Sequence, residues 1–252
     1  MSFETIVATD AADMSRRVAE RFRALTRGAA GNRLAVALSG GNTPRRLYEL
    51  LATAAFRASV RWESVEIFFG DERAVAPEHP DSNYRMAADA LLAALPAPPP
   101  VHRMRAETGE AGEYEALLRE RIPVQRDGIP VLDLVLLGMG ADGHTASLFP
   151  RSTALAERTR LVVMSDGPPG GSRRMTFTYP VLNAARRVWV LVPGEEKRAI
   201  VAQCLAVRDH PGAEQRFPIV GVRPDHGELV WWLDEASAGR AAGAPAGPAP
   251  RG

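Results

Sequence analysis

Short apolar runs recur along this 252-residue chain and alternate with segments of helical periodicity. Runs of four to six apolar residues are typical of strands that are covered on both faces. The strand candidates are Leu34–Leu38, Val65–Phe69, Leu132–Leu137, Leu161–Met164, Val188–Val192, Ile219–Val222 and Leu229–Leu233. The helix candidates are Ala11–Thr26, Pro44–Leu51, Ser82–Leu95, Gly112–Arg121 and Glu195–Val207. This alternation predicts an α/β fold with a mostly parallel sheet and helices on both faces.

The alternation continues unchanged across Pro96–Pro100, PAPPP, which therefore indicates a stiff connector rather than a domain linker. We predict a single domain over residues 1–235. Residues 236–252 are rich in Ala, Gly and Pro and lack apolar periodicity, so a disordered tail is expected there.

Charge and composition narrow the partners of the chain. The net charge is +1, from 31 basic and 30 acidic residues, and the basic residues are scattered. Neither a nucleic acid nor a membrane is therefore expected as a partner, and a small molecule is. The start of the chain resembles no signal peptide, and the single cysteine, Cys204, excludes an internal disulfide framework. We expect a cytoplasmic protein, either a monomer or a small homo-oligomer.

A glycine turn joins the strand LAVAL to the helix that starts near Pro44. Its two glycines permit a tight turn with exposed amides, and Thr43 is a candidate helix cap. A helix amino terminus favours an anion, because its N–H groups are unpaired and carry partial positive charge. The candidate phosphate contacts are Ser39, Gly40, Gly41, Asn42 and Thr43.

A second polar loop, GDER, follows the strand VEIFF and is itself followed by Ser82 and Asn83. It places Asp71 and Arg73 at the carboxyl end of a strand, the edge at which open α/β sheets bind ligands. A solvated charge run is the plainer interpretation of this loop alone. Several such loops at one edge favour a binding site instead.

The segment LDLVLLGMGADGHTASLFP, residues 132–150, carries a third glycine turn after a buried strand. Its glycines spell G-x-G-x-x-G, which raises a dinucleotide-binding alternative with Asp166 as the ribose partner. We reject that alternative, because Pro150 prevents the sustained helix that the fingerprint requires and His144 would occupy the pyrophosphate position. Gly140 and Gly143 are instead candidate donors of backbone amides to the substrate.

His144 lies in this glycine turn rather than on an apolar face, which favours a catalytic role. Asp142, two residues earlier, can help to fix the loop or the tautomer of His144. Ser147 is a weaker candidate nucleophile, because it lacks the G-x-S-x-G elbow.

Two further loops add cations. PGEEKR contains Lys197, the only lysine of the chain, in the first turn of a predicted helix, where the helix dipole opposes it unless a phosphate lies in front. Arg174, just before a strand-like run, is a better ligand candidate than its neighbour Arg173. No motif typical of a metal site is present, so neither a metal nor a cofactor is expected.

Taken together, the motifs resemble those of the 6-phosphogluconolactonases, whose relatives are the glucosamine-6-phosphate deaminases. The motifs that carry the resemblance, up to about residue 233, are LSGGNTPRRLYELL, FFGDERAVAPEHPDSNYRM, LVLLGMGADGHTASLFP, RRMTFTYPVLNAAR and GEEKRAIV. The resemblance implies a Rossmann-like sheet of the sugar-phosphate isomerase and lactonase type. It also implies hydrolysis of 6-phospho-D-glucono-1,5-lactone in the oxidative pentose phosphate pathway, with His144 activating a water molecule.

Two positions favour a lactonase over a deaminase. The deaminases carry Tyr after the Asp-Glu pair and Glu before the proline that closes the histidine loop, where this chain has Arg73 and Phe149. Phe149 cannot take part in the proton transfers that amino-sugar isomerisation needs. Asp71, the enolising base of the deaminases, is accordingly expected to keep only a structural or substrate-orienting role.

Two alternatives remain beside the lactonase. One is an amino-sugar-phosphate isomerase or deaminase on the same scaffold. The other is a non-catalytic sugar-phosphate sensor, for which the short segment before the first predicted strand leaves no room for a DNA-binding helix-turn-helix.

Overall fold

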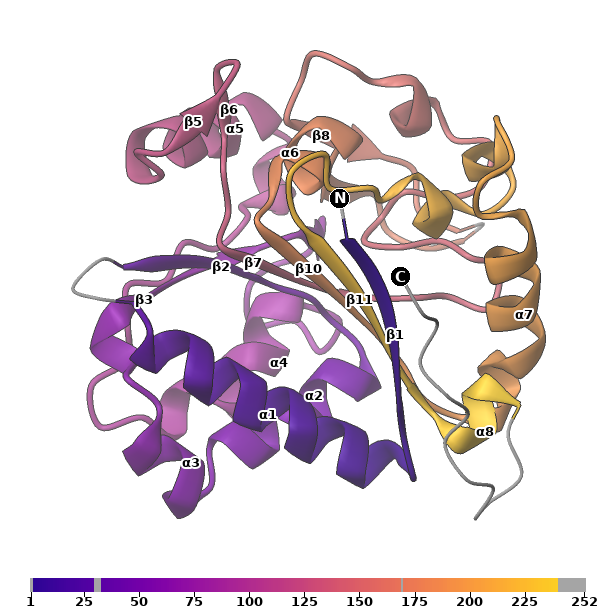
Figure 1. The fold of residues 1–252 in the computed structure, drawn as a ribbon. Helices are drawn as coiled ribbons and strands as arrows, with labels where there is room; N and C mark the ends of the chain where they lie inside the picture. The colour runs from indigo at the N-terminus through magenta and orange to yellow at the C-terminus, as the bar shows by residue number, and fades with distance from the viewer. Residues whose placement is uncertain (1, 30–32, 169, 240–252) are drawn as a thin grey trace.

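In the computed structural model, which describes residues 2–29, 33–168 and 170–239, six strands form one parallel sheet (Figure 1). Every neighbouring pair in this sheet is parallel. In order across it, the strands are β1 (Ser2–Ala8), β11 (Glu228–Asp234), β10 (Arg187–Val192), β7 (Leu134–Gly138), β2 (Leu34–Leu38) and β3 (Val65–Phe69). The prediction of a mostly parallel α/β sheet is confirmed.

Helices cover both faces of the sheet, as Figure 1 shows. One face carries α1 (Ala11–Arg27), α2 (Asn42–Leu51), α3 (Ala54–Ser59) and α4 (Asn83–Ala90). The other carries α5 (Ala111–Arg121), α6 (Tyr179–Ala184), α7 (Arg198–Val207) and α8 (Glu235–Ala238). Two separate apolar cores result, because successive side chains of a strand point to opposite faces. In β7, Leu134 and Leu136 enter one core, and Val135 and Leu137 enter the other.

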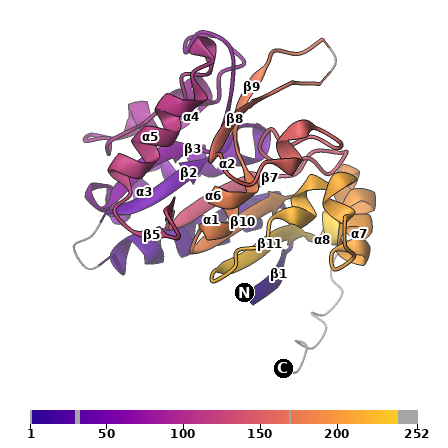
Figure 2. The same ribbon diagram turned by 90° about the horizontal axis from the view of Figure 1, so that it is seen from above.

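Smaller elements surround the parallel sheet. A second, antiparallel sheet consists of β4 (Asp71–Arg73), β9 (Arg174–Phe177) and β8 (Val162–Ser165), and a hairpin of β5 (Gln125–Arg126) and β6 (Ile129–Pro130). Viewed from above in Figure 2, β8 and β9 rise away from the parallel sheet. The 3₁₀ turns are η1 (Trp62–Ser64), η2 (Leu92–Ala94), η3 (Ala106–Thr108), η4 (Thr153–Ala156), η5 (Glu195–Lys197), η6 (Ala213–Gln215) and η7 (Pro218–Gly221).

Some local predictions need correction. Ile219–Val222 is not a strand, because Pro218 starts a 3₁₀ turn there and the Ile219 N–H donates to Gly143 O (3.0 Å). The helix predicted over Ser82–Leu95 ends at Ala90. Strand β1 was not predicted. It is a largely exposed edge strand and therefore has no continuous apolar run.

The chain end also differs from expectation. The tail was expected to start at residue 236, but residues 235–238 form α8. Asp234 and Ser237 bond each other's backbone N–H groups in a capping box, which stabilises this short helix. Residues 240–252 lie outside the described residues, and the single domain over 1–235 stays a prediction.

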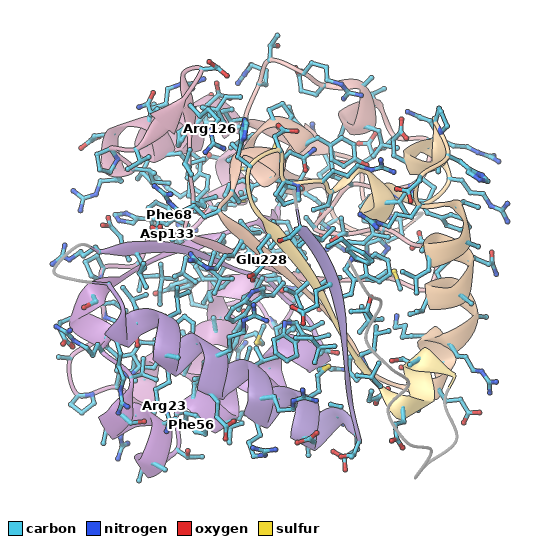
Figure 3. All side chains as sticks on the ribbon, viewed as in Figure 1. Arg23, Phe56, Phe68, Arg126, Asp133 and Glu228 are labelled. Carbon is cyan, nitrogen blue, oxygen red and sulfur yellow. The ribbon has the colours of Figure 1, made fainter. Side chains whose placement is uncertain are left out.

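Asp133 interrupts the apolar run before β7, and the structure explains why an acid stands there. Its carboxylate accepts the Ala35 N–H (3.0 Å) and pairs with Arg186 (3.2 Å). Asp133, which is labelled in Figure 3, stands directly before β7, whose first residue is Leu134. Burial raises the pKa of Asp133. The acid therefore joins the start of β7 to β2 instead of disrupting the sheet.

A buried acid on α5 holds that helix against the antiparallel sheet. The Glu115 carboxylate accepts hydrogen bonds from Arg119 (2.7 Å), Arg160 (3.2 Å) and the N–H groups of Leu161 and Val162 (2.9 and 3.4 Å). Burial alone would raise the pKa of Glu115, but these donors lower it. A depressed carboxylate pKa stabilises the fold above the unfolded pKa of about 4.3, and this stabilisation is lost as the pH falls through the folded pKa.

Glu115→Gln is therefore expected to lower the free energy of unfolding at neutral pH by about 1 to 3 kcal/mol. It should also flatten the decline of stability between roughly pH 5 and pH 3, measured by denaturant unfolding. The control is Glu113→Gln on the same helix, whose side chain is exposed and should leave both quantities unchanged. A wild-type pH dependence in Glu115→Gln would contradict this role.

Candidate active site

A cleft of about 460 Å³ opens at the carboxyl edge of the parallel sheet. The loops that follow β2, β7 and β10 line it, together with β4, β9 and the start of α4. The sequence-predicted site residues that line this cleft are Ser39, Gly40, Gly41, Asn42, Thr43, Asp71, Arg73, Gly140, His144, Arg174 and Lys197. The structure thus brings together residues from five separate segments of the chain.

His144 and Asp142 form a close pair in the loop after β7. The Nδ1 atom of His144 lies 2.6 Å from Asp142 Oδ1, and the same carboxylate oxygen accepts the His144 N–H (3.1 Å). A carboxylate can only accept, so Nδ1 carries a proton, and in the neutral imidazole Nε2 then has the lone pair. The imidazole is 33% exposed and lines the cleft, whereas Asp142 does not line it. Asp142 therefore orients the imidazole without itself lining the cleft.

The protonation of Asp142 agrees with this orienting role. Partial burial raises its pKa, but the His144 backbone N–H and imidazole outweigh burial and hold the pKa below its usual value. Asp142 is thus ionised at neutral pH and remains an acceptor. Phe149 packs beside the imidazole, with its ring centroid 4.7 Å from that of His144.

Gly140 and Gly143 shape the histidine loop rather than donating amides to a substrate. The Gly140 N–H donates to His144 O (2.9 Å), and the Gly143 N–H donates to Gly140 O (3.1 Å). A Cβ on Gly140 would overlap the His144 ring, and Gly143 has a φ of +80° against Phe217. The two amides that were predicted to donate to the substrate are therefore already occupied, and Gly143 does not line the cleft.

Gly143→Ala is expected to destabilise the fold by about 2 to 3 kcal/mol, because it adds a side chain both at positive φ and 2.9 Å from the Phe217 ring. Gly212 is a matched control. It has a φ of +78° with nothing within 4 Å, so Gly212→Ala should cost only about 1 kcal/mol. Denaturant unfolding compares the two variants, and equal losses would argue against a tight contact at Phe217.

The glycine turn after β2 presents an open helix amino terminus to the cleft. Gly41, with a φ of +103°, is the N-cap of α2, and no side chain caps it, so the predicted Thr43 cap is wrong. Tyr48 Oη lies 3.1 Å from Ser39 N and 2.9 Å from Ser39 O and fixes the turn from below. The buried Ser39 Oγ has no hydrogen-bond partner among the described residues. This arrangement suits an anion.

Two arginines face each other across the antiparallel sheet. Arg73 of β4 is directly opposite Arg174 of β9, and both line the cleft. Burial and the neighbouring Arg73 charge lower the pKa of Arg174. Arg73 Nη1 donates to Asp81 O, while its buried Nε has no partner among the described residues. Like charges in such a pair destabilise a sheet, which an anion bound between them would reverse.

Arg173 and Lys197 differ in their position relative to the cleft. Arg173 lies outside the cleft, is 65% exposed and faces Asp166 at 3.9 Å. Lys197 ends η5, directly before α7, and lines the cleft beside Glu196. Within the part of the chain that the structure describes, Lys197 forms no ion pair. Its ammonium is available to a ligand.

Asp71 is held in the cleft wall by neutral donors. Ser147 Oγ donates to its Oδ2 (2.7 Å), and the Asn83 amide donates to its Oδ1 (3.2 Å). Ser147 is fully buried and does not line the cleft, so it is not placed as a nucleophile. Asp71 lines the cleft, so its carboxylate can accept a hydrogen bond from a ligand.

Two residues that shape the site, Asn83 and Glu72, were not predicted from the sequence as site residues. Asn83 lines the cleft, and Glu72 accepts the N–H groups of Arg73, Asn83 and Tyr84 (2.7 to 2.8 Å) and the Ser82 hydroxyl (3.0 Å). Burial raises the pKa of Glu72 above its usual value. The sequence signal was the Ser-Asn pair at the start of a helix shortly after the acid, a pattern that marks a helix cap.

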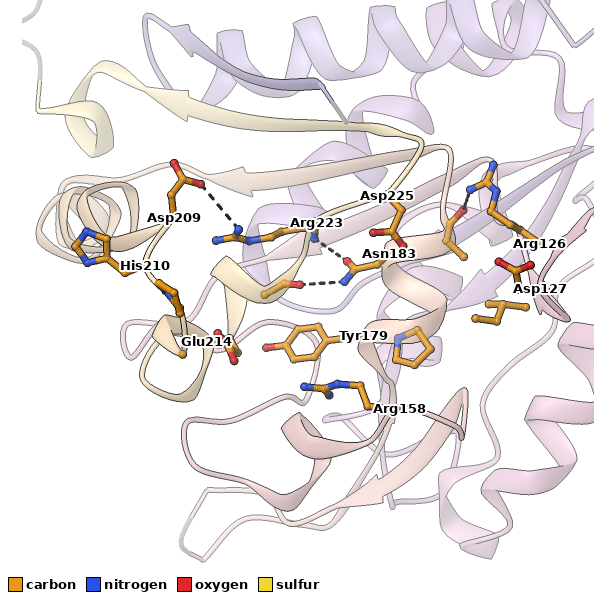
Figure 4. Close-up of a pocket in the computed structure, with 16 residues that line it drawn as sticks. Arg126, Asp127, Arg158, Tyr179, Asn183, Asp209, His210, Glu214, Arg223 and Asp225 are labelled. Atoms are coloured by element: carbon orange, nitrogen blue, oxygen red, sulfur yellow. Dashed lines mark hydrogen bonds and ion pairs between the residues drawn. The ribbon is translucent and has the colours of Figure 1, made fainter.

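A second cavity of about 640 Å³ lies away from these loops, between α6, the β5–β6 turn and the segments before β11 (Figure 4). Its polar groups largely bond one another. Asn183 accepts the Arg223 N–H (2.6 Å) and donates to Gly221 O (3.1 Å), and Arg223 faces Asp209 at 3.9 Å. Four acidic side chains and three arginines line it, so this larger cavity has no excess of positive charge and is a weaker candidate for a sugar-phosphate site.

Cys204 is buried, with its Sγ 4.0 Å from Met139 Sδ, and burial raises the pKa of its thiol to about 12. Among the described residues, no three His, Cys, Asp or Glu side chains are grouped to hold a metal ion. No described helix is long and apolar enough to cross a membrane. That the reaction uses no metal and no cofactor stays a prediction.

Several known proteins are similar to this chain. A 6-phosphogluconolactonase of Synechocystis sp. is 42% identical over 205 residues, which cover 79% of this chain and 81% of the relative. Another from Aggregatibacter actinomycetemcomitans is 33% identical, covering 81% of this chain and 85% of the relative. The crystal structure of 6-phosphogluconolactonase from Leishmania guyanensis superposes with a TM-score of 0.82 at 29% identity, covering 94% of this chain and 98% of that chain.

The family described as glucosamine-6-phosphate isomerases/6-phosphogluconolactonase matches residues 9–231, which include every predicted site residue. The chain therefore belongs to the glucosamine-6-phosphate isomerase/6-phosphogluconolactonase family.

Proposed function

We propose that this chain hydrolyses 6-phospho-D-glucono-1,5-lactone to 6-phosphogluconate, a step of the oxidative pentose phosphate pathway. The observation that carries the proposal is a histidine oriented by Asp142 in a cleft that also presents cations and an uncapped helix terminus. The curated relatives named 6-phosphogluconolactonase support it. One part of this cleft suits the phosphate and another suits the lactone carbonyl.

The phosphate binds first by charge and by backbone amides. Arg73, Arg174 and Lys197 supply cations, and the start of α2 supplies N–H groups. The bound dianion relieves the repulsion between the two opposed arginines, and this relief contributes to the binding energy of the phosphate. Asp71 accepts hydrogen bonds from hydroxyl groups of the sugar and sets the orientation of the ring.

His144 then acts as the general base. Its Nε2 removes a proton from water as the water oxygen attacks the lactone carbonyl carbon, C1. The bond between C1 and the ring oxygen breaks, and the imidazolium returns the proton to that oxygen, which becomes a hydroxyl group. The new carboxylic acid ionises to the product. Lactones hydrolyse slowly on their own, so positioning and one base are sufficient.

Phe149 favours this reaction over amino-sugar deamination. Its ring lies against the imidazole, where a deaminase carries a glutamate. A hydrocarbon ring can neither donate nor accept the protons that ring opening and isomerisation move. The same position gives His144 an apolar wall that limits its contact with bulk water.

The test offers two substrates to the same preparation. With freshly generated 6-phosphogluconolactone, a pH-stat should record acid release above the uncatalysed rate. With glucosamine 6-phosphate, no ammonia release should be detected by a coupled assay. Ammonia release as fast as lactone hydrolysis would overturn the assignment in favour of a deaminase. The cytoplasmic location and the oligomeric state stay predictions from the sequence.

A further inference from the structure

Asn83 is the most deeply buried polar side chain of the cleft wall that sequence reasoning did not assign. It is the first residue of α4, is 1% exposed and lines the cleft. An asparagine with a polar amide in such a position must find partners, because a buried amide without hydrogen bonds is costly. What its amide contacts therefore shows what it does.

The backbone of Asn83 is fixed before its side chain is considered. Glu72 Oε1 accepts the Asn83 N–H (2.7 Å), and Glu72 Oε2 accepts the Ser82 hydroxyl (3.0 Å). Ser82 in turn caps α4 by accepting the Arg85 N–H (3.1 Å). The start of the helix is thus locked to β4, so the side chain of Asn83 enters the cleft wall from a rigid support.

The amide nitrogen of Asn83 holds Asp71 in two ways. Nδ2 donates to Asp71 O (2.9 Å) and to Asp71 Oδ1 (3.2 Å). Ser147 donates to the other carboxylate oxygen (2.7 Å). Each carboxylate oxygen of Asp71 therefore has one protein donor and keeps acceptor capacity for a hydroxyl group in the cleft.

The amide oxygen of Asn83 packs against the phosphate-binding turn. A Cβ on Gly40 would overlap this amide, so the backbone of the turn lies directly on it. Oδ1 is buried without a hydrogen-bond partner among the described residues. One side chain thus touches Asp71 on one side and the Gly40 turn on the other.

We propose that Asn83 is a positioning residue, which fixes the Asp71 carboxylate and the Gly40 turn in the relative placement that receives the substrate. This inference rests on the proposed function of the same cleft. It also explains why residue 40 is glycine without a positive φ: the close approach of the amide, rather than backbone conformation, excludes a side chain there.

The first test is Asn83→Asp, which replaces the N–H donors with a second carboxylate beside Asp71. At neutral pH the two carboxylates repel, and we expect kcat/KM to fall by about tenfold or more. At lower pH the pair shares one proton, which restores a donor between them. The ratio of variant to wild-type kcat/KM should therefore rise as the pH falls.

The ratio removes the other ionisations from the comparison, because they are present in both proteins. The charged and titratable groups around the pair are Glu72 and Arg73 of β4, Asp81 before α4, Arg174 of β9, Tyr48 of α2 and His144. The control is Asn183→Asp in the second cavity, whose amide is also bonded at both ends. Its ratio should stay near one and independent of pH.

The second test is a double-mutant cycle between Gly40→Ala and Asn83→Ala. In the wild type the new methyl group displaces the amide, whereas in Asn83→Ala the space is free. Gly40→Ala should therefore lower kcat/KM severalfold less in the Asn83→Ala background. Circular dichroism and thermal unfolding confirm that each variant is folded.

A pH-independent ratio for Asn83→Asp together with additive effects in the cycle would overturn the positioning role. Those outcomes differ from failure of the proposed function, which would leave the wild-type protein without lactone hydrolysis above the uncatalysed rate.

Discussion

His144→Ala is expected to reduce the catalysed hydrolysis of 6-phosphogluconolactone by about 10²- to 10⁴-fold in kcat. The loss follows from the geometry, because Asp142 orients the Nε2 lone pair as a base and no other imidazole lines the cleft within the described residues. The KM should change little, since the proposed phosphate contacts, the cations and the helix terminus, do not include the imidazole. A pH-stat, with the uncatalysed rate subtracted, measures both constants.

The interpretation of this variant depends on two controls. Binding of 6-phosphogluconate, followed by calorimetry, should remain near the wild-type affinity in His144→Ala. His210→Ala removes a histidine from the second cavity and should keep the wild-type rate. A His144→Ala protein that is folded, binds product and hydrolyses the lactone as fast as the wild type would rule out His144 as the base.

Arg174→Gln is expected to lower kcat/KM by roughly 30- to 1,000-fold, mainly through KM, because it removes a half-buried cation from the phosphate site. This range corresponds to about 2 to 4 kcal/mol for removing one partner of a buried, charge-assisted hydrogen bond. The free protein should nevertheless be as stable as the wild type or more stable, because the substitution ends the repulsion by Arg73 across the sheet. Opposite signs for activity and stability are typical of a binding site.

Arg173→Gln provides the matched control for this prediction. Arg173 is the preceding residue, carries the same charge, is largely exposed and faces Asp166 outside the cleft. Its removal should change KM and the free energy of unfolding by little, since exposed ion pairs contribute about 0 to 1 kcal/mol. Similar KM values for the two variants would show that net charge alone, rather than the position of Arg174, governs phosphate binding.

The parallel sheet could be predicted because its central strands are buried on both faces. Continuous apolar runs such as Val188–Val192 need no knowledge of their neighbours to be recognised. The same rule failed at Ile219–Val222, where an equally apolar run is buried as a 3₁₀ turn against the histidine loop. The burial of a short apolar run can be predicted from its composition. Its backbone conformation depends on the residues that pack against it in the folded protein.

The site residues could be predicted where a glycine turn follows a buried strand, because the carboxyl ends of parallel strands meet at one edge. Their exact roles could not. Gly143 and Gly140 were expected to donate amides, yet both amides close the loop that carries His144. Asn83 was not predicted as a site residue. Its proposed role depends on simultaneous contact with Asp71 and the Gly40 turn, which are not its neighbours in sequence.

The most direct test of the account is the rate of lactone hydrolysis by the wild-type protein. Freshly generated 6-phospho-D-glucono-1,5-lactone and the unphosphorylated glucono-1,5-lactone would be followed in a pH-stat at equal concentrations, each against its uncatalysed rate. The account predicts clear acceleration of the phosphorylated lactone and a far smaller effect on the other, because Arg73, Arg174 and Lys197 line the cleft and are the proposed contacts of the phosphate. A rate equal to the uncatalysed rate for the phosphorylated lactone would contradict it.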